Sequence, residues 1–134
     1  MQTKFYLTRD DVAKLLAAAE AEAKKNSWAV AIVVVDEGGH QLGMVRLDGC
    51  APISSYIATE KGRTAALGRR ESRIYEEMIN NGRTSFLSAP QLQGLLEGGV
   101  PVVVDGHTIG AVGVSGVKSS EDAQIAKAGI AAMA

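Results

Sequence analysis

The sequence has little net charge and almost no cysteine, and each shortage excludes a class of protein. The formal net charge is −1, which gives no reason to expect nucleic acid or an anionic membrane as the main partner. Cys50 is the only cysteine, so the chain can form neither an internal disulfide nor a cysteine-rich metal site. This cysteine usage fits a reducing compartment, and we expect a cytoplasmic protein.

Long apolar segments are also missing. No uninterrupted apolar run approaches the ~20 residues that a membrane-spanning helix requires. Residues 1–10 lack the apolar segment behind a basic start that marks a secretory signal. We therefore expect no membrane partner and no export signal.

Aromatic residues are scarce as well, with one tryptophan, three tyrosines and two phenylalanines in a chain of 134 residues that is 46% hydrophobic. Most of the apolar content is therefore aliphatic, and much of it is alanine. We expect residues 1–134 to form a single domain, with a closely packed aliphatic core and alanine-faced helices near a sheet.

Helical periodicity is present in three parts of the chain. The first runs from about residue 8 to 25, the second from 52 to 80 in two pieces, and the third from 123 to 133. The first and third follow a hydroxyl residue with a carboxylate three positions later, which is typical of a helix cap: Thr8 with Asp11, and Ser119 with Asp122. Gly62 lies inside the second region, where close packing would explain it.

The strand signals occur in two hairpins. Residues 29–35 are rich in β-branched side chains without alternation, which predicts a strand covered on both faces. An acidic pair and two glycines then lead to a return strand over 40–47. Strands over 100–104 and 107–115 flank the turn Asp105-Gly106, and a further short strand is expected within 83–97. The prediction is an α+β fold with an antiparallel meander sheet of about five strands and helices packed on it.

Four stretches, in this order, resemble the GlcG/HbpS family, which also includes the C-terminal domain of PduO. They are VVVDEGGHQL at 33–42, RLDGC at 46–50, KGRTA at 61–65, and GGVP through DG and IGAVGVSG to Asp122 over 98–122. Cys50 and Gly62 stand where the family usually has alanine. Together the four stretches cover the chain from the first predicted helix to the last.

The resemblance implies a profilin-like α-β-α sandwich that assembles into homo-oligomers. Several relatives bind haem, others accompany glycolate, propanediol or glycerol metabolism, and a corrinoid-related role is attached to the PduO context. No shared reaction defines the family, so a function has to be argued from the site.

A basic stretch provides the first candidate site. Arginine and lysine side chains there suit the carboxylates of a ligand such as haem, although a solvated helix face is the usual explanation for such a stretch. Lys61 and Thr64 lie one helical turn apart inside a family motif. Thr64 is a candidate ligand contact, or it bonds its own helix. The stretch comprises Lys61, Arg63, Arg69, Arg70 and Arg73.

The two histidines, His40 and His107, are the candidate metal ligands. Imidazole suits haem iron or zinc. Each histidine, however, follows a predicted tight turn, and this position favours an exposed side chain without a ligand.

Four further residues complete the candidate ligand-binding set. Ser115 and Gly116 end a strand before a predicted helix, where an anion can bind. Close helix packing, however, also explains the glycines of this strand, Gly110 and Gly113. Arg46 either contacts a ligand or forms an ion pair with Asp48. Met44 is a candidate wall for a flat apolar cofactor, or a core residue.

Three functions remain open. The first is a small-ligand-binding accessory protein for sensing, storage or delivery, with haem or a related tetrapyrrole as ligand, linked to diol, glycerol or glycolate metabolism. The second is an enzyme or enzyme-maintenance factor acting on a small acid or a corrinoid. The third is a structural homo-oligomer. The sequence has no evident nucleophile–base pair, which favours binding over independent catalysis.

Overall fold

The computed structural model describes all residues from 1 to 134. Its elements, in chain order, are α1 (Arg9–Lys25), β1 (Ala31–Asp36), β2 (Gln41–Arg46), α2 (Ile53–Gly68), α3 (Ser72–Asn80), the 3-10 helix η1 (Thr84–Ser88), β3 (Gly99–Val104), β4 (His107–Ser115) and α4 (Ser119–Ala131). The three helical regions and two hairpins expected from the sequence are therefore all present.

The sheet is antiparallel, which confirms the predicted α+β class, but it has four strands in the order β2-β1-β4-β3. The expected fifth strand within 83–97 is absent, because this segment forms η1 and irregular chain. The order is also not a simple meander. Residues 31–35 of β1 are fully buried, so their backbone groups need a hydrogen-bonded strand along each edge of β1. β2 is largely exposed and therefore suits an edge of the sheet.

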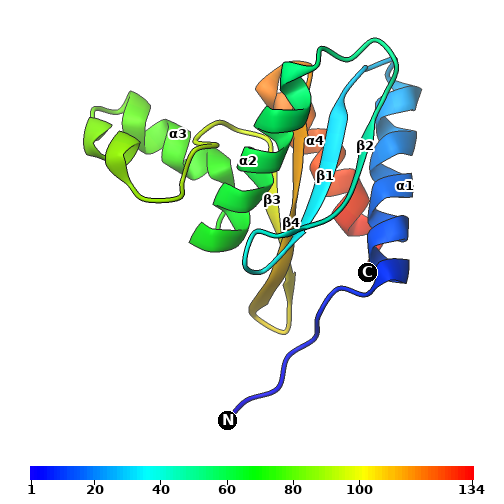
Figure 1. Ribbon diagram of the computed structural model, residues 1–134, viewed down its shortest axis with the longest axis horizontal. Helices are drawn as coiled ribbons and strands as arrows, with labels where there is room; N and C mark the ends of the chain where they lie inside the picture. Colours follow the sequence, from blue (N-terminus) through cyan, green and yellow to red (C-terminus); the bar gives the residue numbers. More distant parts are fainter.

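Helices cover both faces of the sheet, as expected for an α-β-α sandwich (Figure 1). α1 and α4 pack on one face around a core of fifteen buried residues that includes Leu15, Ile32 and Ile125. α2 packs on the other face, where the core consists of seven residues, five of them alanine. α3 and η1 extend to the side of this second layer (Figure 1).

The thin alanine layer lets α2 approach the sheet closely. A Cβ atom added to Gly113 of β4 would lie 2.0 Å from the carbonyl oxygen of Ala58, and one on Gly62 would lie 3.3 Å from the Gly113 nitrogen. The close packing predicted at Gly62 is confirmed, and it brings the polar residues of α2 near the ends of β3 and β4.

Of the two helix caps predicted from the sequence, the one at α1 is confirmed and the one at α4 is not. At α1, the Asp11 nitrogen donates to the Thr8 hydroxyl and the Thr8 nitrogen donates to the Asp11 carboxylate. At α4 the predicted cap is wrong. The carboxylate of Glu121 accepts the capping bond from the Lys118 nitrogen, and Asp122 is buried instead.

The second hairpin turns as its sequence predicts. Asp105 and Gly106 both adopt positive φ angles, of 51° and 77°, as a two-residue type I′ turn requires.

None of the helices has both the length and the apolar character needed to cross a bilayer.

Candidate functional site

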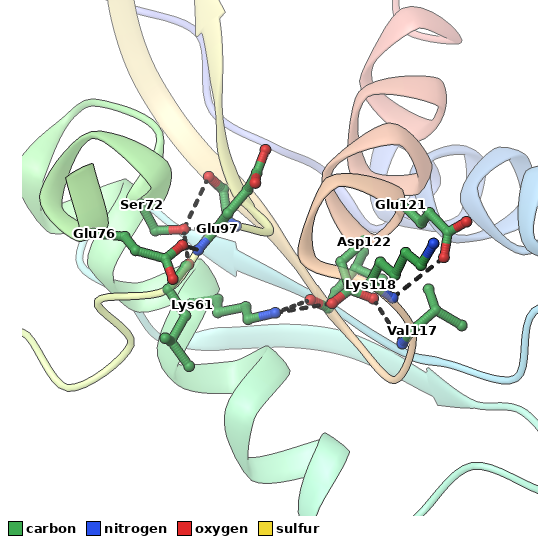
Figure 2. A network of polar contacts seen from close by, with 11 residues as sticks. Lys61, Ser72, Glu76, Glu97, Val117, Lys118, Glu121 and Asp122 are labelled. Carbon is green, nitrogen blue, oxygen red and sulfur yellow. Dashed lines mark hydrogen bonds and ion pairs between the residues drawn. The ribbon is translucent and has the colours of Figure 1, made fainter. Parts of the chain in front are cut away.

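Lys61, the central residue of the predicted basic site, is buried and has two partners inside the protein. Its Nζ lies 3.0 Å from Oδ2 of Asp122 and donates to the carbonyl oxygen of Val114 at 3.0 Å. The side chains of Lys61 and Asp122 are only 3% and 2% exposed. Figure 2 shows the lysine extending from α2 towards the start of α4. Lys61 thus links the helical layers on opposite faces of the sheet.

Gly98, just before β3, makes room for this link. A Cβ atom at this position would lie 2.8 Å from the Lys61 Nζ. At the far end, the Val117 nitrogen donates to Oδ1 of Asp122 at 3.2 Å. Burial raises the pKa of the Asp122 carboxyl above its ordinary value, although the Lys61 ammonium and the Val117 amide both act to lower it.

Thr64, the second motif residue, is also an internal tie. Its side chain is fully buried, and Oγ1 accepts a hydrogen bond of 3.1 Å from the Gly94 nitrogen. Gly94 packs so closely on α2 that a Cβ atom would lie 2.2 Å from the carbonyl carbon of Glu60. Thr64 therefore fixes the chain that leads into β3.

A second polar network, which was not predicted from the sequence, holds the same segment a few residues further along, at the start of β3. The Ser72 hydroxyl donates to the Leu96 carbonyl at 2.5 Å and accepts from the Gly99 nitrogen at 2.8 Å. The Glu97 nitrogen donates to the Glu76 carboxylate at 2.9 Å (Figure 2). The only sequence signal for this network is a serine at the start of a short helix, and its hydroxyl does not cap that helix.

The arginines of the basic stretch mostly contact their own surroundings. The half-buried Arg63 donates to Gln91 at 3.3 Å and lies 3.9 Å from Glu60. Arg70 lies over the ring of Tyr75, and Arg73 pairs with Glu77 at 2.6 Å. The structure therefore does not bring these cations together around one cavity.

The remaining predicted contacts lie at different places. The expected ion pair of Arg46 with Asp48 is wrong, because both side chains are exposed and neither lies in an ion pair; both line a pocket of about 470 Å³ at the end of β2. Met44 is 36% exposed on β2. Ser115 is buried, and Gly116 is close-packed, since a Cβ atom there would lie 2.6 Å from the Ala29 oxygen.

The two histidines lie at the same end of the sheet, because the two hairpin turns before them are brought together by the pairing of β1 with β4. His40 is 80% exposed, and its Nδ1 lies 3.1 Å from Oδ1 of Asp36. Burial pushes the pKa of the Asp36 carboxyl upward, but donors from His40 and Gly38 outweigh it and hold that pKa below its ordinary value.

His107 is half-buried and lines a pocket of about 290 Å³. We call this the histidine pocket; its lining residues are Thr3, Lys4, Phe5, Asp105 and His107. Lys4 also forms an ion pair with Glu37 in the turn between β1 and β2. This pair joins the N-terminal segment to the sheet.

An adjoining pocket of about 200 Å³ shares Phe5 with the histidine pocket and is mainly apolar. Phe5, Tyr6 and Leu42 line it and are 62%, 77% and 41% exposed. The protein has no cluster of three or more metal-ligating His, Cys, Asp or Glu residues. One imidazole, an exposed apolar surface and an ammonium group are instead adjacent, an arrangement able to hold a flat apolar ring that carries a metal and carboxylates.

Comparison with known proteins gives a consistent result. A family model described as Haem degrading protein HbpS-like matches residues 7–131. Protein GlcG of Escherichia coli strain K12 is 60% identical over 115 residues, which covers 86% of this chain and 85% of that protein.

Two solved structures have the same fold. A double mutant of Streptomyces reticuli HbpS aligns with a TM-score of 0.89 and 29% identity, over 100% of this chain and 91% of that one. A complex of PduOC with haem aligns with a TM-score of 0.83 and 27% identity, over 96% of this chain and 95% of that one.

Proposed function

The chain belongs to the family described as Haem degrading protein HbpS-like, and on that premise we propose that it binds haem at the histidine pocket. The observation that carries the proposal is His107, a half-buried residue whose imidazole lines the same pocket as the exposed Phe5 and the ammonium group of Lys4. The likeness to a haem complex of a relative supports the choice of ligand.

Three residues of the histidine pocket have complementary roles in this proposal. His107 would ligate the iron, Phe5 would contact the face of the macrocycle, and Lys4 would pair with a propionate. The apolar pocket beyond Phe5 extends the surface available to the ring. Haem supplies iron whose redox potential depends on its axial ligand, and the protein contributes the ligand, the apolar contact and the charge.

A haemin titration followed by absorbance tests the proposal. The wild-type protein should give a saturable one-to-one shift of the Soret band. His107→Ala should weaken binding at least about tenfold and change the spectrum, and added imidazole should restore the wild-type spectrum by occupying the vacated position.

His40→Ala is the matched control, because it removes the other histidine at the same end of the sheet. It should bind haemin as the wild type does. A loss in His40→Ala equal to that in His107→Ala would reject His107 as the ligand, and the absence of any saturable shift would reject haem binding.

Haem breakdown is a second candidate, favoured by the description of the family model. Its test uses haem-loaded protein mixed with hydrogen peroxide. If the protein promotes breakdown, the Soret band should decay faster than that of free haemin and His107→Ala should abolish the difference. Equal decay rates would leave binding alone as the function.

The proposal extends to the role of binding in the cell. A haem-binding accessory protein would act in sensing, storage or delivery, and the family's association with diol, glycerol and glycolate metabolism supports a role beside those pathways. A homo-oligomer is also part of this proposal, and a solution mass measurement of the wild-type protein tests it: a monomer would overturn it.

A further inference from the structure

The pocket of about 470 Å³ lies at the opposite end of the sheet from the histidines. It is formed where the last turns of α1, the connection to β1 and the end of β2 meet. Its lining residues are Glu20, Lys24, Ser27, Trp28, Ala29, Val45, Arg46, Leu47 and Asp48. We call it the Trp28 pocket. Its volume falls in the range of about 300–1,000 Å³ typical of small-molecule sites.

The charges around the Trp28 pocket are arranged in one satisfied pair and two free groups. Lys24 and Glu20 form an ion pair of 2.9 Å along α1. Arg46 and Asp48 line the pocket as well, yet neither side chain lies in any ion pair or hydrogen bond of the protein. The pocket therefore offers one free guanidinium and one free carboxylate to a ligand.

The third feature is the indole of Trp28, the only tryptophan of the chain. It is half-buried and packs against the larger core, so its position is fixed by neighbours outside the pocket. Val45 and Leu47 add aliphatic surface beside it. An apolar or aromatic group of a ligand can rest on this surface while its charged end meets Arg46 and Asp48.

We propose that the Trp28 pocket binds a zwitterion, namely a free α-amino acid with an apolar side chain. The carboxylate of the ligand pairs with Arg46, for which a guanidinium is the best-matched partner. The ammonium group of the ligand pairs with Asp48, and the side chain contacts Trp28. The site is separate from the histidine pocket, and the inference does not depend on haem binding.

Fluorescence of Trp28 reports on the site directly, because no other tryptophan contributes to the signal. The experiment titrates the full chain with L-phenylalanine, with 2-phenylethylamine, which lacks the carboxylate, and with 3-phenylpropionate, which lacks the ammonium group. L-phenylalanine should give a saturable change and bind roughly tenfold or more tightly than either analogue, since each lost charge-assisted contact has about that effect.

Two variants assign the contacts. Arg46→Ala should abolish the advantage of L-phenylalanine over 2-phenylethylamine, and Asp48→Asn should abolish its advantage over 3-phenylpropionate. Arg9→Ala and Asp10→Asn, which change exposed charges at the distant start of α1, should preserve both. The absence of a saturable change with L-phenylalanine, or equal binding of all three compounds, would overturn the proposal.

Discussion

The ammonium group of Lys61 and the carboxylate of Asp122 meet inside the protein at 3.0 Å, although they belong to helices on opposite faces of the sheet. The lysine passes the end of the sheet where Gly98 has no side chain. The pair therefore ties α2 to α4 around β4, and it joins two of the four sequence stretches that resemble the family.

Breaking this pair on one side should destabilise the fold strongly. Lys61→Met leaves the buried Asp122 carboxylate without its partner, which costs about 3–5 kcal/mol. The double variant Lys61→Met/Asp122→Leu should recover much of that loss, because no uncompensated charge remains. Urea denaturation at pH 7 measures both effects.

Lys25→Met is the control for Lys61→Met, since it replaces a lysine whose side chain is 74% exposed. It should change the free energy of unfolding by less than about 0.5 kcal/mol. If Lys61→Met proves equally mild, the buried pair does not hold the layers together.

Gly98→Ala tests the opening through which Lys61 passes. Gly98 has a φ angle of +132°, and a Cβ atom there would lie 2.7 Å from the Val114 oxygen as well as near the Lys61 Nζ. Gly82→Ala is a matched control, because Gly82 has a φ angle of +104° but nothing within 4 Å of the added atom. Both variants place alanine at a positive φ angle and therefore strain the backbone. Only Gly98→Ala adds a steric clash, so the difference between the two variants measures that clash.

We expect Gly98→Ala to lower the free energy of unfolding by at least about 1–3 kcal/mol more than Gly82→Ala, the usual cost of overpacking. Thermal or urea denaturation of the two variants gives the difference. Equal losses would mean that Lys61 reaches Asp122 without needing the space at Gly98.

The local elements of the fold could be predicted because their signals are local. The apolar run at 29–35 predicted a strand covered on both faces, and Asp105-Gly106 predicted the turn of the second hairpin. The strand order could not be predicted in this way, since it depends on β4 pairing with β1 rather than on neighbouring residues. The full burial of β1 on both faces was nevertheless a signal for a central position.

The site was predicted less well for the same physical reason. Lys61 and Asp122 are 61 positions apart, so the sequence did not show that they form an ion pair with each other. Lys61 was therefore predicted to contact a ligand. The position of Asp122 three residues after Ser119 suggested a cap, which Glu121 provides instead. The common location of His40 and His107 was deducible only once the two hairpins were placed side by side.

The turn that holds His40 should make a pH-dependent contribution to stability. The pKa of Asp36 is lowered in the folded protein, so the folded state binds fewer protons than the unfolded state at acidic pH. The contribution of the carboxylate is present above the unfolded pKa of about 3.9 and is lost as the pH falls through the folded value.

Asp36→Asn should therefore have a lower urea midpoint than the wild type at pH 7, and the gap should narrow at about pH 3. Asp48→Asn removes an exposed carboxylate elsewhere and should show no such convergence. A gap that stays constant from pH 7 to pH 3 would contradict a role for the charge of Asp36.

If haem binds at the histidine pocket as proposed, the ion pair of Lys4 with Glu37 should control how fast it leaves. It joins the N-terminal segment, which supplies Thr3 and Phe5 to the wall of the pocket, to the turn between β1 and β2. Reversing one charge, in Lys4→Glu or Glu37→Lys, places like charges together and should release the segment. Because both groups are partly exposed, we expect haem transfer to apomyoglobin to quicken only up to about fivefold.

The double variant Lys4→Glu/Glu37→Lys restores an attractive pair and keeps one ammonium group beside the pocket. Its transfer rate should return towards that of the wild type, and high salt should reduce the differences among all four proteins because salt screens exposed charges. A double variant that releases haem as fast as the single variants would reject this pair as the contact that holds the segment. The contact of Lys4 with a propionate and the packing of Leu7, a residue of the larger core, would then account for haem retention. The charge swap thus distinguishes a segment held by the ion pair from one held by apolar packing, because only the ion pair depends on the signs of both residues.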